Sequence, residues 1–456
     1  MKRIVSFITL FILLVSLTSC LPQRPDAPDA EDGYQQDGSI NRFAELDLQP
    51  MLYILYSYNY DYWYGRDVSV LNEKGELIVE NYKGSAWYIM DPDKPAGTPE
   101  SVFGVLLRSR SSEDQGWDIV ILDKSGKKVT VPDGPNLWLN QEIRFGFMEF
   151  QTGEFDTTDE MDPIFIGGSG LYDVAGGRIA IEPRYQSLEI LDENLVYASD
   201  KNGCFFLDFK GNVRCELTGI SWVHTYLYDG SGVFVAENES DRKILIDKDG
   251  NRLTEKDYYW INGEFFGEYT IAYYYWDNYD AKNIVLLNKQ GQEFPMPGNN
   301  SAESFIITSN YAVAITPDGF YTIGKDRTAS ALTLTDDYVS WGTEIGGVVF
   351  VQTDTDVYIL NQNGEVVETR DNCYLNTFYY SESFVAFTKS DDRARQMELY
   401  TIVNGTLKKY EHNVLSVINV TPDGQLFICL NSAAYGFKDM QGNWVYKQSN
   451  FEELSD

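Results

Sequence analysis

Short apolar stretches alternate with polar turns along most of the chain, and one arrangement of the two recurs. Two or three apolar residues are followed by Asp or Asn, two variable residues and Gly, and then by another apolar or alternating stretch. The flanks are rich in β-branched and aromatic residues, which favours strands, and Gly supplies the positive φ that closes a tight turn. The motif is clear at Gly75, Gly126, Gly176, Gly211, Gly250, Gly291, Gly364 and Gly442, and weaker at Gly324 and Gly405.

The spacing of these turns predicts a repeat architecture. Successive turns are about 40 residues apart, a period at which each unit is one supersecondary element. Three or four short strands fit into such a unit, which is the size of a propeller blade, and long helical patterns are almost absent. We therefore expect an all-β fold, a β-propeller of about seven to ten short-stranded blades. An open β-solenoid and two smaller tandem propellers are the alternatives. We expect residues 443–448 to close the ring by pairing beside residues 52–58.

One turn has a second interpretation, because residues 244–253 (ILIDKDGNRL) also look like the start of a calcium loop. An EF-type loop that began at Asp247 would need an acidic residue at its twelfth position, which is Tyr258. A ligand position is also not expected to vary between units as the position of Asp249 does. We therefore predict a bare turn and no metal site. The equivalent positions hold Lys74, Ser125, Lys210, Gln290, Asn363 and Gln441.

The N-terminus has the pattern of an exported protein. Lys2 and Arg3 precede an apolar run at 4–17 that is too short for a good membrane span, as in a secretory signal. The sequence that ends at Cys20, Leu-Thr-Ser-Cys, resembles the bacterial lipobox, and the rule of that family makes Cys20 the lipidated mature N-terminus. An ordinary signal peptide with a chance cysteine is the alternative.

These features divide the chain into three parts. We expect a signal peptide at 1–19, a lipidated Cys20 with an acidic, Pro-containing tether at 20–49, and a β-repeat domain at 50–456. The expected location is the bacterial cell envelope, with the chain lipid-anchored and extracytoplasmic at the outer membrane or cell surface. The formal net charge of −33 makes nucleic acid a poor partner. The expected partners are the membrane, through the anchor, and an envelope protein or a glycan.

The last unit adds a resemblance to a known repeat family. The sequence YGFKDMQGNWVYKQSNF resembles a WG-type β repeat, with Tyr435-Gly436, Asp439, Gly442, Trp444 and an aromatic residue at Phe451. Residues 171–185 have the same tail, whereas the other units lack the aromatic-Gly opening. Because exported repeat proteins of this type are mostly of unknown biochemical role, the resemblance implies a fold and a compartment rather than an activity.

The turn at Gly211 also predicts a cysteine pair. If Leu207 paired with Asn212, the register of the hairpin would bring Cys204 opposite Cys215, within disulfide range. Oxidation is permitted in an exported protein, and two free thiols are the alternative. The spacing of Cys204, Cys215, Cys373 and Cys429 is not that of zinc sites.

We find no catalytic constellation and expect no cofactor. His224 and His412 are far apart in sequence and lie in no nucleophile, metalloprotease or P-loop motif. Carboxylate clusters such as Asp156/Asp159/Glu160/Asp162 and Asp391/Asp392 are typical of solvated loops. A glycosidase would need two carboxylates that face each other across a cleft.

The aromatic residues give the most informative excess. The chain has 32 Tyr residues, which cluster at 53–65 and 257–280. Half of these rings are expected in the core, because strands alternate faces. The others predict an aromatic binding platform at Trp260, Tyr274, Trp276 and Tyr279. We therefore expect a cell-envelope lipoprotein that presents its β-repeat domain as a ligand- or protein-binding or assembly module without catalysis. A glycan-active enzyme with paired carboxylates on a propeller scaffold is the alternative.

Overall fold

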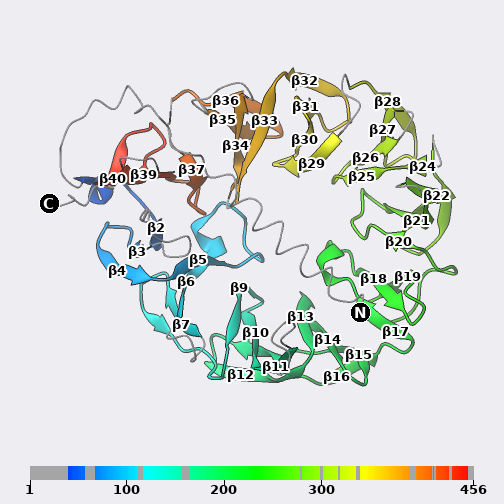
Figure 1. Cartoon of the computed structure of the whole chain (residues 1–456), viewed down its shortest axis with the longest axis horizontal. Helices are drawn as coiled ribbons and strands as arrows, with labels where there is room; N and C mark the ends of the chain where they lie inside the picture. Colours follow the sequence, from blue (N-terminus) through cyan, green and yellow to red (C-terminus); the bar gives the residue numbers. More distant parts are fainter. Residues whose placement is uncertain are drawn as a thin grey trace.

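The computed structural model is an all-β ring of short sheets (Figure 1). Its sheets are numbered here as blades 1 to 10 in chain order. Residues 1–19 of the predicted signal peptide, Cys20, most of the predicted tether, Tyr279, Phe451 and the carboxylates Asp159, Glu160, Asp162, Asp391 and Asp392 lie outside the described residues. The structure describes residues 40–56, 67–110, 117–156, 164–277, 280–297, 301–316, 319–334, 339–379, 381–389, 397–412, 414, 417–430 and 434–449.

Blades 1 to 5 are antiparallel meanders of three or four strands. Blade 1 comprises β2 (Tyr53–Tyr56), β3 (Asp67–Leu71) and β4 (Leu77–Lys83). Blade 2 comprises β5 (Ser85–Met90), β6 (Val102–Arg110), β7 (Trp117–Asp123) and β8 (Lys128–Val129). Blade 3 comprises β9 (Trp138–Arg144), β10 (Phe147–Asp156), β11 (Ile164–Asp173) and β12 (Arg178–Tyr185). Blade 4 comprises β13 (Ser187–Asp192), β14 (Leu195–Asp200), β15 (Gly203–Leu207) and β16 (Val213–Glu216), and blade 5 comprises β17 (Ile220–Val223), β18 (Val233–Asn238) and β19 (Lys243–Asp247).

Blades 6 to 10 continue the same order around the ring. Blade 6 comprises β20 (Trp260–Ile261), β21 (Tyr269–Asp277), β22 (Asp280–Asn288), β23 (Glu293–Pro295) and β24 (Ser301–Ala302). Blade 7 comprises β25 (Ser304–Ile307), β26 (Tyr311–Thr316), β27 (Gly319–Gly324) and β28 (Ala329–Leu332). Blade 8 comprises β29 (Val339–Ile345), β30 (Val348–Thr353), β31 (Val357–Leu360) and β32 (Val366–Arg370). Blade 9 comprises β33 (Cys373–Phe378), β34 (Ser381–Lys389), β35 (Met397–Val403) and β36 (Thr406–Lys409), and blade 10 comprises β37 (Val417–Val420), β38 (Phe427–Leu430), β39 (Ala434–Lys438) and β40 (Trp444–Ser449).

The helical content of the described residues is three 3₁₀ turns, η1 (Phe43–Glu45), η2 (Pro99–Ser101) and η3 (Thr225–Leu227). Among these residues no helix has the length and apolar character needed to cross a membrane. Blades 2 and 3 are joined into one eight-stranded sheet by a single parallel bridge between Met90 and Glu142. We count them as two blades, because each is a separate four-stranded meander. The fold is therefore the predicted β-propeller, with ten blades in the described part of the chain.

Each of the ten predicted turns lies in a different blade. In blade 5, Asp247 Oδ1 accepts hydrogen bonds from the backbone N–H groups of Asp249 and Asn251, and Oδ2 accepts one from Asn251 Nδ2. Gly250 has φ = +80° and donates its N–H to the Asp247 carbonyl. Both carboxylate oxygens of Asp247 are therefore engaged within a tight turn of the chain.

The ring closes through a strand that precedes the predicted domain. β1 (Ile40–Asn41) pairs with β40, with Ile40 opposite Lys447 and Asn41 opposite Tyr446, whereas β2 pairs with β3. The prediction that 443–448 pair beside 52–58 is therefore wrong, and so is the domain boundary at residue 50. A two-residue strand is too short to produce a recognisable hydrophobic period, which is why the sequence did not indicate it.

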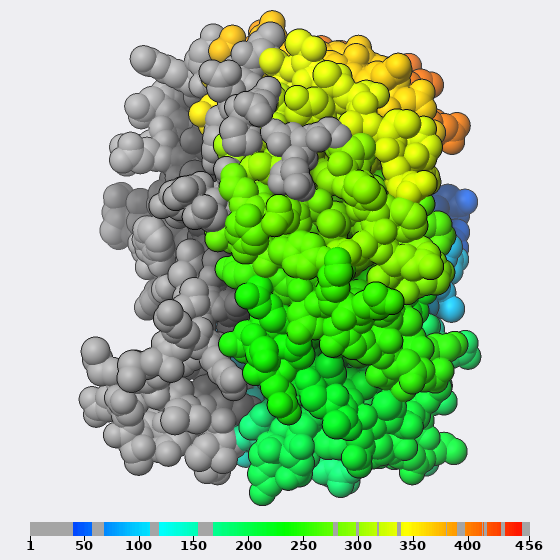
Figure 2. Space-filling model, turned by 90° about the vertical axis from the view of Figure 1, so that its right-hand side faces the viewer, coloured from blue at the N-terminus to red at the C-terminus, as the bar shows by residue number. Residues whose placement is uncertain are grey.

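Packing between blades continues around the whole ring. Nine hydrophobic clusters fill the ten interfaces between neighbouring blades, because one cluster spans blades 10, 1 and 2. Figure 2 shows the outer wall, where successive blades lie side by side without a break over the green-to-yellow part of the chain. This packing agrees with one closed ring rather than an open solenoid or two tandem propellers. In blades 3, 4, 7 and 8 the first strand lies toward the centre and the last toward the outside, as Figure 1 shows.

Candidate functional site

Exposed aromatic and aliphatic side chains occupy different parts of the ring. The exposed aliphatic residues lie mainly on outer strands or their ends, for example Ile78, Ile179, Val213 and Val367. Six of the exposed aromatic residues, 40% to 77% exposed, instead lie on the first strand of a blade or beside it. We call these six the inner aromatic set, which comprises Trp138, Tyr226, Tyr259, Trp341, Tyr374 and Tyr379.

These six aromatic side chains are exposed, so packing of the blades does not account for them. The two faces of a first strand pack against the neighbouring blades, so a side chain on it that stays exposed borders the central space. Large aromatic side chains dominate core and interface energetics when they are buried, and an exposed cluster of them marks a binding surface. The inner wall of the ring is therefore the candidate functional site.

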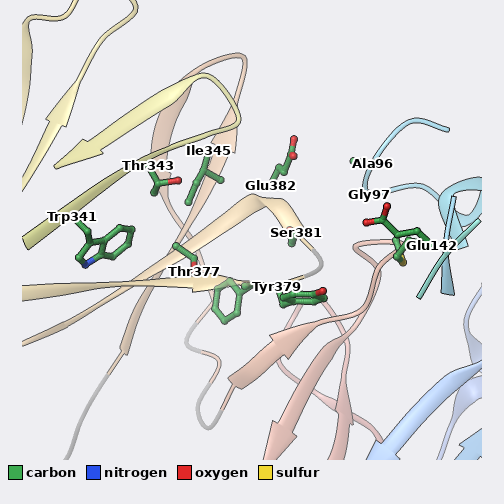
Figure 3. A pocket seen from close by; sticks show the side chains of 12 residues that line it. Ala96, Gly97, Glu142, Trp341, Thr343, Ile345, Thr377, Tyr379, Ser381 and Glu382 are labelled. Atoms are coloured by element: carbon green, nitrogen blue, oxygen red, sulfur yellow. The ribbon is translucent and has the colours of Figure 1, made fainter. Parts of the chain in front are cut away.

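The first cavity on this wall has a volume of about 430 Å³ and lies where two sides of the ring meet. In Figure 3, Trp341 and Tyr379 lie on one side, and Glu142 with the backbone at Ala96 and Gly97 lies on the other. The connection between β5 and β6 brings Ala96 and Gly97 from blade 2 to blades 8 and 9. The other lining residues are Met90, Thr343, Ile345, Thr377, Phe378, Ser381 and Glu382.

A second cavity of about 470 Å³ is formed by blades 3, 4 and 5. Glu142 lines both cavities, so the two are adjacent along the inner wall. The second cavity is more polar, and Tyr226 of the inner aromatic set contributes to its wall. Its other lining residues are Asn140, Arg144, Glu149, Glu189, Ile190, Leu191, Thr225, Tyr228, Asp229 and Gly230.

Glu149 connects blade 3 to blade 4 at this cavity. Its Oε1 accepts a hydrogen bond of 2.6 Å from the backbone N–H of Ile190, and its Oε2 accepts one of 3.0 Å from Asn140 Nδ2. Burial raises the pKa of Glu149 to about 7, and the negative charge of Glu189 acts in the same direction. Glu149 is therefore a group at the inner wall that changes charge near neutral pH.

The other charges of the second cavity are unevenly balanced. Arg144 is the one cation that lines it, and its guanidinium donates a hydrogen bond of 2.8 Å to the carbonyl of Ile190. Glu189 accepts a hydrogen bond from the Thr225 hydroxyl. Within the described residues, no cationic side chain forms an ion pair with any of the four carboxylates of the cavity, Glu142, Glu149, Glu189 and Asp229.

His224 lies behind the rim of the second cavity and packs against aromatic rings. Its ring centre is 5.7 Å from that of Tyr226 and 5.8 Å from that of Trp260, with edge-on geometry in both contacts. Burial, with the positive charge of Lys243 in the same direction, lowers the pKa of His224 to about 4. His224 is therefore neutral at physiological pH and supports the position of Tyr226.

The three described residues of the predicted aromatic platform lie in blade 6 and have different ring contacts. Trp260 contacts His224, Tyr274 contacts Tyr258 at 5.1 Å, and Trp276 contacts Tyr273 at 5.7 Å. The hydroxyl of Tyr274 also donates to Glu293, which ties it to the blade, and only Trp276 of the three is exposed. Trp260 and Trp276 thus have Tyr273 as a common neighbour, since Trp260 is paired with it across β20 and β21, whereas Tyr274 is bonded to Glu293.

The predicted register of Cys204 and Cys215 is wrong. The turn closes between Asp208 and Asn212, and a bulge follows, so Cys215 lies opposite Phe206 while Leu217 donates its N–H to the carbonyl of Cys204. The two cysteines are thus diagonal neighbours, with Cα atoms about 7–8 Å apart, which is too far for a disulfide. Neither forms one. Cys215 instead packs beneath the turn of blade 5, where a Cβ on Gly250 would lie 2.5 Å from its Sγ.

The sequence did not identify the inner aromatic set. Trp138, Trp341 and Tyr374 are scattered over 236 residues, and no local pattern distinguishes them from core aromatics. Their position in the repeat is the sequence feature that could have identified them, because each lies on the first strand of a blade.

Comparisons with known proteins give a similarity in fold. No protein-family model matches the chain, and no curated protein matches it. A crystal structure of the eukaryotic initiation factor is 12% identical over 88% of this chain and 96% of its own, with a TM-score of 0.47. BamB from Moraxella catarrhalis is 15% identical over 67% of this chain and 96% of its own, with a TM-score of 0.32. The C-terminal WD40 domain of Sif2 is 10% identical over 75% and 96%, with a TM-score of 0.32.

Proposed function

We propose that this protein is a lipid-anchored module of the bacterial cell envelope whose ring binds a partner at its inner wall. The location of the exposed aromatic residues is the observation that carries this proposal. Tyr and Trp combine a large apolar area with a polar group, and they are enriched where proteins bind partners. Their gathering on the strands that open the blades gives one surface to which many blades contribute.

The anchor places this surface outside the cytoplasm. Cys20 follows a lipobox-like sequence, and the acidic segment after it separates the ring from the lipid. The direct test is the variant Cys20→Ser in the full chain, followed by separation of membrane and soluble fractions. We expect the wild-type chain with the membranes and the variant in the soluble fraction. A variant that still sediments with the membranes would contradict lipid anchoring at Cys20.

Site-specific photo-crosslinking tests the binding surface. A benzoylphenylalanine residue is introduced at Trp341 on the inner wall, or at Val213 on the outer wall as the control, in cells that make the full chain. Both positions are exposed, so a crosslinker is accessible at each, and the two positions differ in the side of the ring on which they lie. We expect an adduct from position 341 and none from position 213. Equal yields from the two positions, or adducts from position 213 alone, would contradict the proposal.

The first cavity also favours a second candidate function, that of a glycan-active enzyme. Glu142 and Glu382 both line this cavity, together with Trp341 and Tyr379, and paired carboxylates with aromatic rings are the components of a glycosidase site. Incubation of the purified ring with polysaccharides distinguishes this function from binding. Release of reducing ends by the wild type but not by Glu142→Gln would establish the enzyme, and binding without release supports the module.

A further inference from the structure

We propose that the inner wall binds an extended, basic segment of a partner polypeptide, which spans both cavities and inserts a cationic side chain into the second. This inference rests on the proposed function and names the chemistry of the partner. It depends on three features of the wall: the continuity of the two cavities, the separation of charge across the blades, and the position of Tyr226.

The cavities are arranged for a chain rather than for a compact molecule. They share Glu142, which belongs to β9, and their other residues extend from blades 8 and 9 on one side to blade 5 on the other. An extended polypeptide advances about 3.3 Å per residue and points successive side chains in opposite directions. One segment can therefore place an apolar side chain beside Trp341 and a later side chain beside Tyr226.

Charge is separated between the inside and the outside of the ring. The first strands of the ten blades carry four acidic residues, Glu142, Glu189, Asp192 and Glu344, and a single basic one, Arg144. The last strands carry ten basic residues and six acidic ones. The negative inner wall is therefore not a mere consequence of the net charge of −33. A concave surface of one sign attracts ligands of the opposite sign.

The second cavity combines this charge with an exposed ring. Tyr226 is 69% exposed, and His224 supports it edge-on at 5.7 Å. A guanidinium or ammonium group in the cavity would stack on the Tyr226 ring and reach the carboxylates of Glu189 and Asp229, which also line the space. The one resident cation, Arg144, is held by the carbonyl of Ile190. A basic side chain thus supplies the charge that the cavity lacks.

The same observations argue against a glycan as the occupant. An acidic glycan would be repelled by Glu142, Glu189 and Asp229, and a neutral one would leave their charges without a counterion. A neutral oligosaccharide that binds this wall would therefore gain from the aromatic rings alone. The test includes it as a separate ligand.

The experiment measures fluorescence anisotropy with three labelled probes and the purified full-length chain. The first probe is an extended peptide that alternates arginine with leucine and serine, the second carries glutamate in place of arginine, and the third is a neutral β-linked oligosaccharide. We expect binding of the arginine peptide that weakens with added salt, and no binding of the other two. Preferred binding of the glutamate peptide or of the oligosaccharide would overturn the inference.

Variants locate the binding on the wall. We expect Glu142→Gln and Glu189→Gln each to weaken the arginine peptide about tenfold, which corresponds to about 1.4 kcal/mol, and Trp341→Ala to weaken it by a similar factor. Glu216→Gln, an exposed glutamate on the outer strand β16, is the matched control and should leave the affinity unchanged. If either charge variant melts below the wild type, Tyr226→Ala replaces it, because Tyr226 is mostly exposed.

Unchanged affinity in all the inner-wall variants would overturn the inference. The inference and the proposed function fail in different ways. Crosslinks from position 341 without any binding of the arginine peptide would leave the binding module intact and remove the basic partner. Absence of crosslinks from position 341 would contradict the proposed binding module itself.

Discussion

Seven of the ten repeat turns use the same hydrogen bonds of an Asp or Asn side chain. The side-chain Oδ1 accepts the backbone N–H groups two and four residues further on, and Gly at the fourth position has φ between +73° and +85°. Glycine is needed for a second reason, because several of these turns touch the preceding blade. A Cβ at Gly291 would lie 2.4 Å from the carbonyl oxygen of Leu253.

This double role predicts the effect of substitution at Gly291. Gly291→Ala adds both backbone strain at a positive φ and a clash of its Cβ with Leu253. Gly146→Ala adds only the backbone strain, because nothing lies within 4 Å of a Cβ at Gly146. We expect the first variant to lose roughly 3 kcal/mol in its free energy of unfolding, and the second about 1 kcal/mol. Denaturant titration measures both, and equal losses would show that the turn does not press on the preceding blade.

A second residue-scale prediction concerns the pH dependence of stability. Burial raises the pKa of Glu149 from 4.5 to about 7 in the folded protein, so the folded chain holds this proton more tightly than the unfolded chain does. The stabilisation is complete below pH 4.5 and is lost as the pH rises through about 7. We expect this loss to be at most roughly 3 kcal/mol.

Thermal melts between pH 5 and pH 8 measure the effect. The melting temperature should fall with pH in the wild type and fall less in Glu149→Gln, which is neutral throughout. Glu216→Gln is the control and should follow the wild type. A parallel fall in wild type and Glu149→Gln would exclude Glu149 as the titrating group.

At the scale of elements, closure depends on a short segment outside the repeat. Phe43 is fully buried after β1, and its ring centre is 5.2 Å from that of Tyr53, 5.8 Å from Phe437 and 6.3 Å from Tyr446. It therefore packs against blades 1 and 10 at once. Asn41 adds a hydrogen bond of 2.8 Å from its Nδ2 to the carbonyl of Gly75.

Truncation of this side chain should weaken the whole ring. We expect Phe43→Ala to cost about 3–5 kcal/mol in the free energy of unfolding, as for other fully buried aromatics, and Phe43→Leu to recover part of this loss. Denaturant titration with far-UV circular dichroism measures both variants. If Phe43→Ala unfolded at the same denaturant concentration as the wild type, residues 40–45 would not be part of the folded ring.

The repeat turns were predictable from the sequence because each is formed by hydrogen bonds between residues close together in the chain. Asp247 and Gly250 form their hydrogen bonds within five residues, so the sequence around them determines the turn. Three turns depart from the pattern. Gly177 rather than Gly176 has the positive φ in blade 3, and in blade 7 Arg327 takes that role after Gly324. In blade 9 Asn404 and Gly405 both have positive φ in a two-residue turn. The register between Cys204 and Cys215 was not predictable, because a bulge after the turn depends on how blade 5 packs.

At the scale of the whole molecule, the blade count was predicted only as a range and the site was missed. Ten turns were visible, yet only the sheets show that each belongs to its own blade. The inner wall is assembled from residues as distant as Glu142 and Tyr379, which both line the first cavity. Such a site has no sequence signature, since its members share a place in the blade rather than a motif.

The inner wall exists only if the chain closes into one ring, so closure is the claim on which the binding proposals depend. Ile40 and Lys447 are opposed in the pair β1–β40, so the double variant Ile40→Cys/Lys447→Cys in the full chain should form a disulfide under mild oxidation. Proteolysis followed by mass spectrometry without reduction detects it as linked N- and C-terminal fragments. We predict an intramolecular link in nearly all molecules. Absence of the link, or links only between molecules, would contradict a closed ring.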